Sequence, residues 1–287
     1  MRIAFVLMLT VAVLLPMCQL VSADVSDYRA AALANPNIMH YYSMENAANP
    51  GEDTAGALDL TETAYGTGNT ANIVYGPTDL GGNSSRTITP ENANSASNEG
   101  AGLFNNSGSF SATASMTVEA ILKVTGEAGP PLHIISGGAG ASRGNFLYQE
   151  GGTHGLGTWV GGERTQFFQA AENNWYYVSA VFETNGGNTD ISGMWADLSG
   201  NGPLTAITPR THTGNFGQGG TNLAVGMHNN PNWAFVGALD EVAFYSSALS
   251  QSDIENNFRA LTIPEPSTLA ILGTFVLGGL SIRRLRV

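Results

Sequence analysis

The carboxylic side chains that hydrolytic chemistry needs are present, but the sequence does not pair them. Hydrolysis of a glycosidic bond uses two carboxyl groups about 5–9.5 Å apart. Glu119 is the only acidic residue in the alternating segment 116–125, and Asp240 and Glu241 are adjacent. Adjacent side chains of a strand point to opposite faces. We therefore expect a protein that is not an enzyme, with a glycoside hydrolase acting through Glu119 as the less favoured alternative.

Three other catalytic patterns give no support for an enzyme. The segment 140–144 matches Gly-x-Ser-x-Gly, but that motif needs a strand before the serine and a helix after it. Here glycines precede the serine and a strand-like segment, 145–148, follows, which predicts a hairpin loop. Lys123, the sole lysine, has no glycine-rich phosphate loop before it. The histidines show no zinc-ligand spacing; they are His40, His133, His154, His212 and His228.

Carboxylates from three separate segments form a candidate calcium site. Cys18 is the only cysteine and lies in the N-terminal leader described below, so the remaining chain has no disulfide or thiolate ligand. Calcium prefers hard oxygen ligands such as carboxylates and carbonyls. Glu45 ends the first expected strand, Asp240 lies in the last, and Asp53 lies in the loop between 50 and 56. If the first and last strands pair, these three converge, and calcium becomes the expected cofactor; otherwise they are solvated acids.

Two tryptophans are candidates for sugar binding, because pyranose C–H groups pack against aromatic ring faces. Trp159, between Gly157 and Gly161, and Trp233, which follows an Asn- and Pro-rich segment, are both expected in loops. Trp175 and Trp195 fall within strand patterns and are expected in the core. The alternative for Trp159 and Trp233 is simple packing of their loops.

Composition limits the class of partner. The 287 residues carry a formal net charge of −12, which repels phosphate backbones and argues against nucleic acid. The 36 glycines, with Asn, Ser and Thr between short apolar runs, favour a β protein with many loops.

Period-2 alternation identifies the elements that must position these side chains. Residues 116–125 and 175–184 alternate between an apolar face and a second face, and further strands are expected at 38–44, 191–198, 223–227 and 234–245. The long segment 50–108 is expected to be mainly loop, with brief strands at 58–60 and 71–75. Helices are expected at 27–34 and from Ser250, as N-cap, to Leu261. This pattern predicts an all-β, two-sheet antiparallel sandwich with a short C-terminal helix.

The N-terminus reads as a secretory leader. A basic start and the apolar run 3–15 precede small residues at 21–23, which predicts a signal peptide, residues 1–23, removed by signal peptidase. A lipoprotein site at Cys18 is disfavoured by the bulky Met17 before it.

The C-terminus combines Pro264, Glu265 and Pro266 with the apolar run 269–282 and a terminal group of arginines. This arrangement resembles the PEP-CTERM sorting signal of Gram-negative bacteria. The resemblance implies an exosortase-type processing enzyme and, before processing, a hydrophobic helix held in the inner membrane. That helix is short for a bilayer core of about 30 Å. An ordinary C-terminal anchor is the alternative.

The central segments 28–33, 41–45, 116–120, 175–181 and 237–245 resemble the laminin-G-like jelly roll of the concanavalin A-like lectin and glucanase superfamily. The resemblance implies neighbouring first and last strands, and a concave face or loop rim for sugars. The Glu-x-Asp-x-x-Glu run of that superfamily's hydrolases is missing.

These observations predict three segments: the leader 1–23, a jelly-roll domain at 24–262 and the sorting segment 263–287. The expected function is a secreted, non-catalytic protein of the cell envelope or extracellular matrix that binds a polysaccharide or a matrix protein. A structural matrix protein without a ligand is the alternative from a different class.

Overall fold

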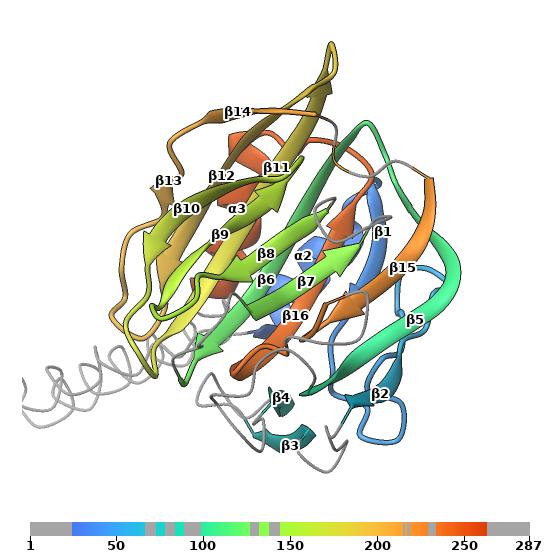
Figure 1. Ribbon diagram of the computed structural model, residues 1–287. Coiled ribbons are helices and arrows are strands. Elements are labelled where there is room, and N and C mark those ends of the chain that lie inside the picture. Colours follow the sequence, from blue (N-terminus) through green and yellow to red (C-terminus); the bar gives the residue numbers. More distant parts are fainter. Residues whose placement is uncertain are drawn as a thin grey trace, which may run out of the picture.

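The computed structural model describes residues 25–66, 73–77, 84–88, 99–126, 132–137, 144–214, 216, 219–228 and 234–262. These residues form two antiparallel sheets packed face to face, with two helices outside them (Figure 1). The expected all-β sandwich is therefore confirmed. The leader 1–23, Trp233, the sorting residues Pro264, Glu265 and Pro266, and the expected terminal helix lie outside the described residues.

Sheet A contains the first and last strands of the described chain. Its strands are β1 (Ile38–Tyr42), β3 (Ile73–Pro77), β4 (Ser84–Ile88), β6 (Ser115–Val124), β11 (Trp175–Asn185), β12 (Asn188–Asp197), β13 (Thr205–Ala206), β14 (Arg210–Thr213) and β16 (Gly237–Tyr245). They run in the order β13-β12-β11-β6-β16-β4-β3, with β1 also paired to β16 and β14 to β12. The pairing of β1 with β16 confirms that the first and last strands are neighbours.

Sheet B carries the strands that form the opposite face of the sandwich. Its strands are β2 (Thr61–Gly66), β5 (Glu99–Ala112), β7 (Leu132–Gly137), β8 (Asn145–Gln149), β9 (Gly155–Val160), β10 (Glu163–Gln169) and β15 (Gly219–Val225). Their order is β10-β9-β8-β7-β15-β5-β2. In Figure 1, β7 to β10 lie in front of sheet A.

The alternation of β6 explains how the core is divided. Val118, Ala120 and Leu122 are fully buried in the core between the sheets, whereas Ile121 belongs to a second apolar cluster on the other side of sheet A. Aromatic rings fill the centre, with Phe110 and Phe244 centroids 5.5 Å apart. Because burying one large apolar side chain contributes about 1.5–3 kcal/mol, this core is the main source of stability.

Two helices cover the outer face of sheet A. They are α2 (Val25–Ala34) and α3 (Gln251–Thr262), and they lie on the side of sheet A away from sheet B (Figure 1). The expected cap of α3 is confirmed, because the Asp253 amide donates to Ser250 Oγ at 3.2 Å and the Ser250 amide donates to Asp253 at 3.1 Å. Leu249 and Ile254 are both buried in the cluster beneath the helices.

Several strands of sheet B differ from the expectations. The segment 50–108, expected to be mainly loop, contains β2 and the start of the long strand β5. Strands β7, β9 and β10 had no expected counterpart, because glycines and polar residues interrupt their apolar alternation; the buried polar residues include His133 and Thr158. Around the Gly-x-Ser-x-Gly segment, β7 and β8 pair antiparallel, in agreement with a hairpin, although residues 138–143 themselves are not described.

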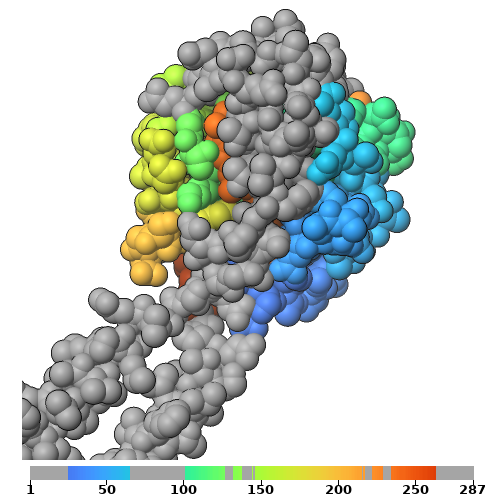
Figure 2. All heavy atoms as spheres, turned by 90° about the horizontal axis from the view of Figure 1, so that it is seen from below, coloured from blue at the N-terminus to red at the C-terminus, as the bar shows by residue number. Residues whose placement is uncertain are grey.

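Figure 2 views the molecule from below. The blue residues near the start of the described chain lie at the lower right, and the yellow and gold residues, which include β11 to β14 of sheet A, lie on the left. In the described part of the chain, neither helix has the length and apolar composition to cross a membrane.

Candidate functional site

A partly exposed cluster of aromatic and charged side chains lies on the outer face of sheet B. Leu156, Val160 and Phe168 of β9 and β10 are buried in the core. Trp159 and Arg164 are direct cross-strand partners. Since successive side chains of a strand alternate, Trp159 beside Val160 faces away from the core, and its partner Arg164 faces the same way.

Four side chains on this face form a connected group, called the β8–β10 site below. The Arg164 guanidinium lies over the Trp159 ring, 4.3 Å from its centroid. Arg164 Nη1 donates to Glu150 Oε1 at 3.1 Å, and the Tyr148 hydroxyl donates to Glu150 Oε2 at 2.8 Å. The side chains of Arg164 and Glu150 keep 38% and 32% of their surface exposed. The site therefore presents both N–H donors and carboxylate acceptors to solvent.

Gly157, but not Gly155, lets β10 approach β9 closely enough to build this site. A Cβ at Gly157 would lie 2.0 Å from the carbonyl oxygen of Thr165. A Cβ at Gly155 would meet only the side chain of Gln166, at 2.8 Å. The close approach of the β9 and β10 backbones therefore requires glycine at position 157. As a result, β9 places no side chain between Tyr148 and Gln166.

The structure corrects the expected location of Trp159, which lies in strand β9 and not in a loop. The ring is partly buried, its Nε1 has no hydrogen-bond partner among the described residues, and His133 stacks beside it with a centroid distance of 6.1 Å. The other candidate, Trp233, lies outside the described residues.

Sequence reasoning missed Glu150 and Arg164. A signal was present in the Gly161-Gly162 pair, because a two-residue hairpin rich in glycine places the residues on either side of it in register. Both glycines have positive φ, 64° and 89°, as such a turn requires. The hairpin pairs Val160 with Glu163 and Trp159 with Arg164.

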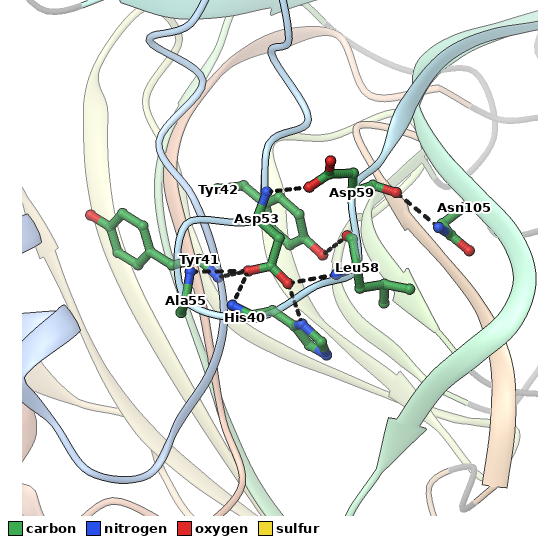
Figure 3. A network of polar contacts seen from close by, with 9 residues as sticks. His40, Tyr41, Tyr42, Asp53, Ala55, Leu58, Asp59 and Asn105 are labelled. Atoms are coloured by element: carbon green, nitrogen blue, oxygen red, sulfur yellow. Dashed lines mark hydrogen bonds and ion pairs between the residues drawn. The ribbon is translucent and has the colours of Figure 1, made fainter.

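Asp53, one of the three expected calcium ligands, is occupied by protein donors (Figure 3). Its carboxylate accepts from the amides of Tyr41 at 2.9 Å and Leu58 at 3.0 Å, and it contacts His40 Nδ1 at 2.6 Å. Burial alone would raise the pKa of Asp53, but these contacts outweigh burial and lower it. Asp53 thus fastens the loop that follows β1.

Glu45 and Asp240 belong to a different cluster, centred on Arg29. Arg29 donates to Glu45 Oε2 at 2.6 Å and also to Glu241, which in addition accepts from the Tyr41 hydroxyl. Burial raises the pKa of Asp240 well above its usual value, and the negative charges of Glu241 and Glu45 raise it further. The structure therefore brings Glu45 and Asp240 into one cluster without Asp53.

The expectation that Asp240 and Glu241 point to opposite faces is wrong. A β-bulge interrupts the pairing of β16 with β6 at these residues, and Glu241 has a φ of 49°. The charges of Arg29 and Glu45 act on both carboxyl groups, which are fully buried. A bulge breaks the regular alternation on which the expectation rested.

No group of three or more His, Cys, Asp or Glu side chains is arranged to hold a metal ion in the described ranges. Calcium binding stays a prediction, and a calcium titration of the melting temperature tests it. An unchanged melting temperature would argue against the site.

Glu119, the candidate carboxylate of the hydrolase alternative, is enclosed between sheet A and the two helices. It is fully buried and accepts from the hydroxyls of Tyr28, Tyr177 and Tyr245 at 3.0, 2.6 and 3.0 Å and from Asn257 Nδ2 at 3.0 Å. Burial raises the pKa of Glu119, while these donors act to lower it. A polysaccharide has no access to this carboxylate, so its role is to hold the helices.

Comparison with known families agrees with this geometry. A family model described as the concanavalin A-like lectin/glucanases superfamily matches residues 96–255, more than half of the chain. The chain belongs to this superfamily. The matched range includes the β8–β10 site. Comparison with curated protein sequences finds no match.

Two solved structures similar to this superfamily member are parts of an arabinanase and a sialidase. Domain 4 of AbnA, an extracellular arabinanase from Geobacillus stearothermophilus, was solved in complex with arabinotriose. It is 15% identical with a TM-score of 0.51, over 77% of this chain and 98% of the domain. Trypanosoma rangeli sialidase is 10% identical with a TM-score of 0.49, over 79% of this chain but only 33% of the sialidase. At these identities the similarity shows the fold alone.

These comparisons correct the expectation that the chain is not an enzyme. Domain 4 of AbnA, which has a similar fold, is part of an arabinanase, so this fold gives no ground for excluding catalysis. The lack of a recognisable carboxylate pair in the sequence is not enough to exclude catalysis, because catalytic groups can come from different strands.

Proposed function

We propose that the chain binds carbohydrate at the β8–β10 site. The observation that carries the proposal is the Arg164 guanidinium, held over Trp159 and fixed to Glu150 while both charged side chains remain partly exposed. An arginine held in this way offers N–H donors in a fixed geometry, and sugars are rich in hydroxyl acceptors. Domain 4 of AbnA, which shares the fold, was solved with arabinotriose, in agreement with the proposal.

The test is binding to a panel of immobilised polysaccharides, with the wild-type protein, Arg164→Ala and Arg259→Ala. Arg259 is the matched control, because it is 62% exposed and lies on α3 at the opposite side of the molecule. We expect Arg164→Ala to weaken binding at least tenfold and Arg259→Ala to leave it unchanged. Release of reducing ends, measured in the same samples, reports whether a bound glycan is also cut.

Binding that is equal in both variants would place the carbohydrate elsewhere. A wild-type protein that binds no member of the panel, but is retained in isolated extracellular matrix, would favour the structural alternative or a protein partner.

We also propose that the protein is exported and sorted to the cell envelope or extracellular matrix. The sequence supports this with the leader 1–23 and with Pro264, Glu265 and Pro266 ahead of the apolar run 269–282.

Intact mass and cell fractionation of the native protein and Glu265→Ala test this part of the proposal. We expect a wild-type species without either terminal segment outside the cell, and an unprocessed C-terminus held in the inner membrane for Glu265→Ala. A wild-type protein that keeps residues 263–287 would favour an ordinary anchor.

A further inference from the structure

We infer that the ligand of the β8–β10 site is a neutral sugar with adjacent hydroxyl groups, bound by Arg164 and Glu150 together and not by stacking on the face of Trp159. This inference rests on the proposed carbohydrate binding and specifies its ligand class. It follows from how the aromatic ring is covered, from the hydrogen-bonding chemistry of the ion pair and from the charges around it.

The Trp159 ring is engaged by protein side chains. The Arg164 guanidinium lies 4.3 Å from the ring centroid, and the His133 ring is nearly parallel to the indole, at an angle of 25°. A sugar that stacked on the face held by Arg164 would first have to displace the guanidinium and break its ion pair with Glu150. The indole therefore supports the guanidinium, which is an established arrangement for arginine on an aromatic face.

Counting only contacts with the described residues, the ion pair leaves unused hydrogen-bonding capacity on both partners. Arg164 carries five N–H donors and spends one on Glu150, 3.1 Å away. Each Glu150 oxygen accepts one hydrogen bond, from Arg164 or Tyr148, and a carboxylate oxygen has two acceptor sites. A hydroxyl group donates one hydrogen bond and accepts others. Two adjacent hydroxyls of a sugar thus match the pair, one accepting from Arg164 and the other donating to Glu150.

The local charge disfavours acidic sugars. Arg164 and Glu150 neutralise one another, so the ion pair adds no net charge to the site. The whole chain carries −12. A carboxylate or sulfate on the ligand would therefore meet the negative potential of the chain, and Arg164, the cation of the β8–β10 site, is already paired with Glu150.

The experiment compares polygalacturonate and polymannuronate with their methyl esters, and with neutral galactan and mannan, using the full-length protein. The esters keep the sugar hydroxyls and remove the negative charge. We expect the best neutral ligand to bind at least tenfold more tightly than the acidic polymers. Its affinity should change less than twofold between 50 and 500 mM NaCl, where the Debye screening length falls from about 14 Å to about 4 Å, because no ion pair forms with the ligand. Periodate oxidation followed by reduction, which removes adjacent hydroxyl pairs, should abolish binding.

Substitutions at Arg164 and Glu150 test the contribution of the donors and of the acceptors separately. Arg164→Ala removes the donors and uncovers the Trp159 ring, and we expect at least a tenfold loss of affinity, with partial recovery in Arg164→Lys. Glu150→Gln removes the negative charge and one of the two acceptor oxygens, and it should weaken binding two- to fivefold. Circular dichroism and melting temperatures confirm that each variant is folded.

Each contrary result identifies which inference has failed. Tighter binding by Arg164→Ala would mean that the sugar stacks on Trp159. Preferred binding of the acidic polymers, lost in Arg164→Ala, would overturn the neutral ligand class and leave the proposed function intact. No binding to any polymer by the wild-type protein would overturn the proposed function itself.

Discussion

Two glutamates show how the same chemistry serves different purposes on the two faces of the sandwich. Glu119 on sheet A and Glu150 at the end of β8 both accept hydrogen bonds from tyrosine hydroxyls. Glu119 is fully buried under α2 and α3, whereas the Glu150 side chain is 32% exposed. The difference lies in what covers the sheet and not in the residue type.

The covered face uses its carboxylate to join elements, and the open face keeps capacity for a ligand. Four side-chain donors from four elements satisfy Glu119, among them Tyr28 of α2 and Asn257 of α3. Glu150 has one donor on each oxygen. A buried polar group with every partner in place stabilises one arrangement, whereas an incompletely used, exposed pair can bind another molecule.

The largest expected effect comes from Glu119→Ala. The substitution leaves three buried hydroxyls and an amide without their acceptor, so we expect the free energy of unfolding to fall by about 4 kcal/mol. Urea denaturation measures this change. Glu150→Ala is the matched control on the open face, and it should cost less than about 1 kcal/mol, because exposed ion pairs contribute little. Equal losses in the two variants would contradict the distinction between the faces.

Gly157→Ala tests the backbone approach that builds the open face. The new Cβ would lie 2.0 Å from the Thr165 carbonyl oxygen, so β9 and β10 must separate. We expect a loss of roughly 2–3 kcal/mol and weaker carbohydrate binding. Gly155→Ala, on the same strand, meets only the movable end of Gln166 and should cost less than about 1 kcal/mol. Thermal denaturation and the polysaccharide panel measure both effects.

The pH dependence of stability should arise mainly from the covered face. Burial raises the pKa of Glu241 from 4.5 to about 7, and it also raises those of Asp240 and Glu119. The folded state then binds protons more tightly than the unfolded state. The stabilisation is complete below about pH 4.5 and is lost as the pH rises through about 7, on the order of 3 kcal/mol for Glu241.

Melting temperatures measured between pH 4.5 and 8.5 test whether stability falls as the pH rises. In Glu241→Gln the melting temperature should depend less on pH. Asp53 acts in the opposite direction at lower pH: its lowered pKa means that stability is lost as the carboxylate becomes protonated below about pH 4. Stability that rises from pH 5 to 8 in the wild-type protein would contradict the assignment.

The smallest effect concerns the end of the covering helix. Ser250→Ala removes the side-chain oxygen that accepts from the Asp253 amide, and we expect a loss of about 1 kcal/mol. Ser252→Ala, inside the first turn, should change stability by less than about 0.5 kcal/mol. Chemical denaturation of the two variants distinguishes a cap from a general effect of serine substitution.

Local patterns in the sequence were sufficient for the central strands of sheet A and its helices, but β4, β13 and β14 had no expected counterpart. The alternation of 116–125 and 175–184 and the cap at Ser250 predicted β6, β11 and α3, because each depends on residues close together in the chain. The strands of sheet B were harder to predict, since β9 mixes glycines with a buried threonine.

The site depended on pairings that the sequence does not reveal directly. Trp159 was a candidate, but its partners come from a turn and a neighbouring strand whose register is set by Gly161-Gly162. The bulge that turns Asp240 and Glu241 toward the same charges also has no local signature, because it arises from the pairing of β16 with β6.

The shared use of Glu119 also has a consequence for the order in which the chain can fold. Its donors Tyr28 and Asn257 lie 91 and 138 positions away, one before it and one after it. A ribosome adds about 5–20 residues per second, so the buried carboxylate spends several seconds without its last donor during synthesis. The finished domain therefore cannot form until residue 257 has left the ribosome. Until then, the nascent chain remains incompletely folded and accessible to other proteins.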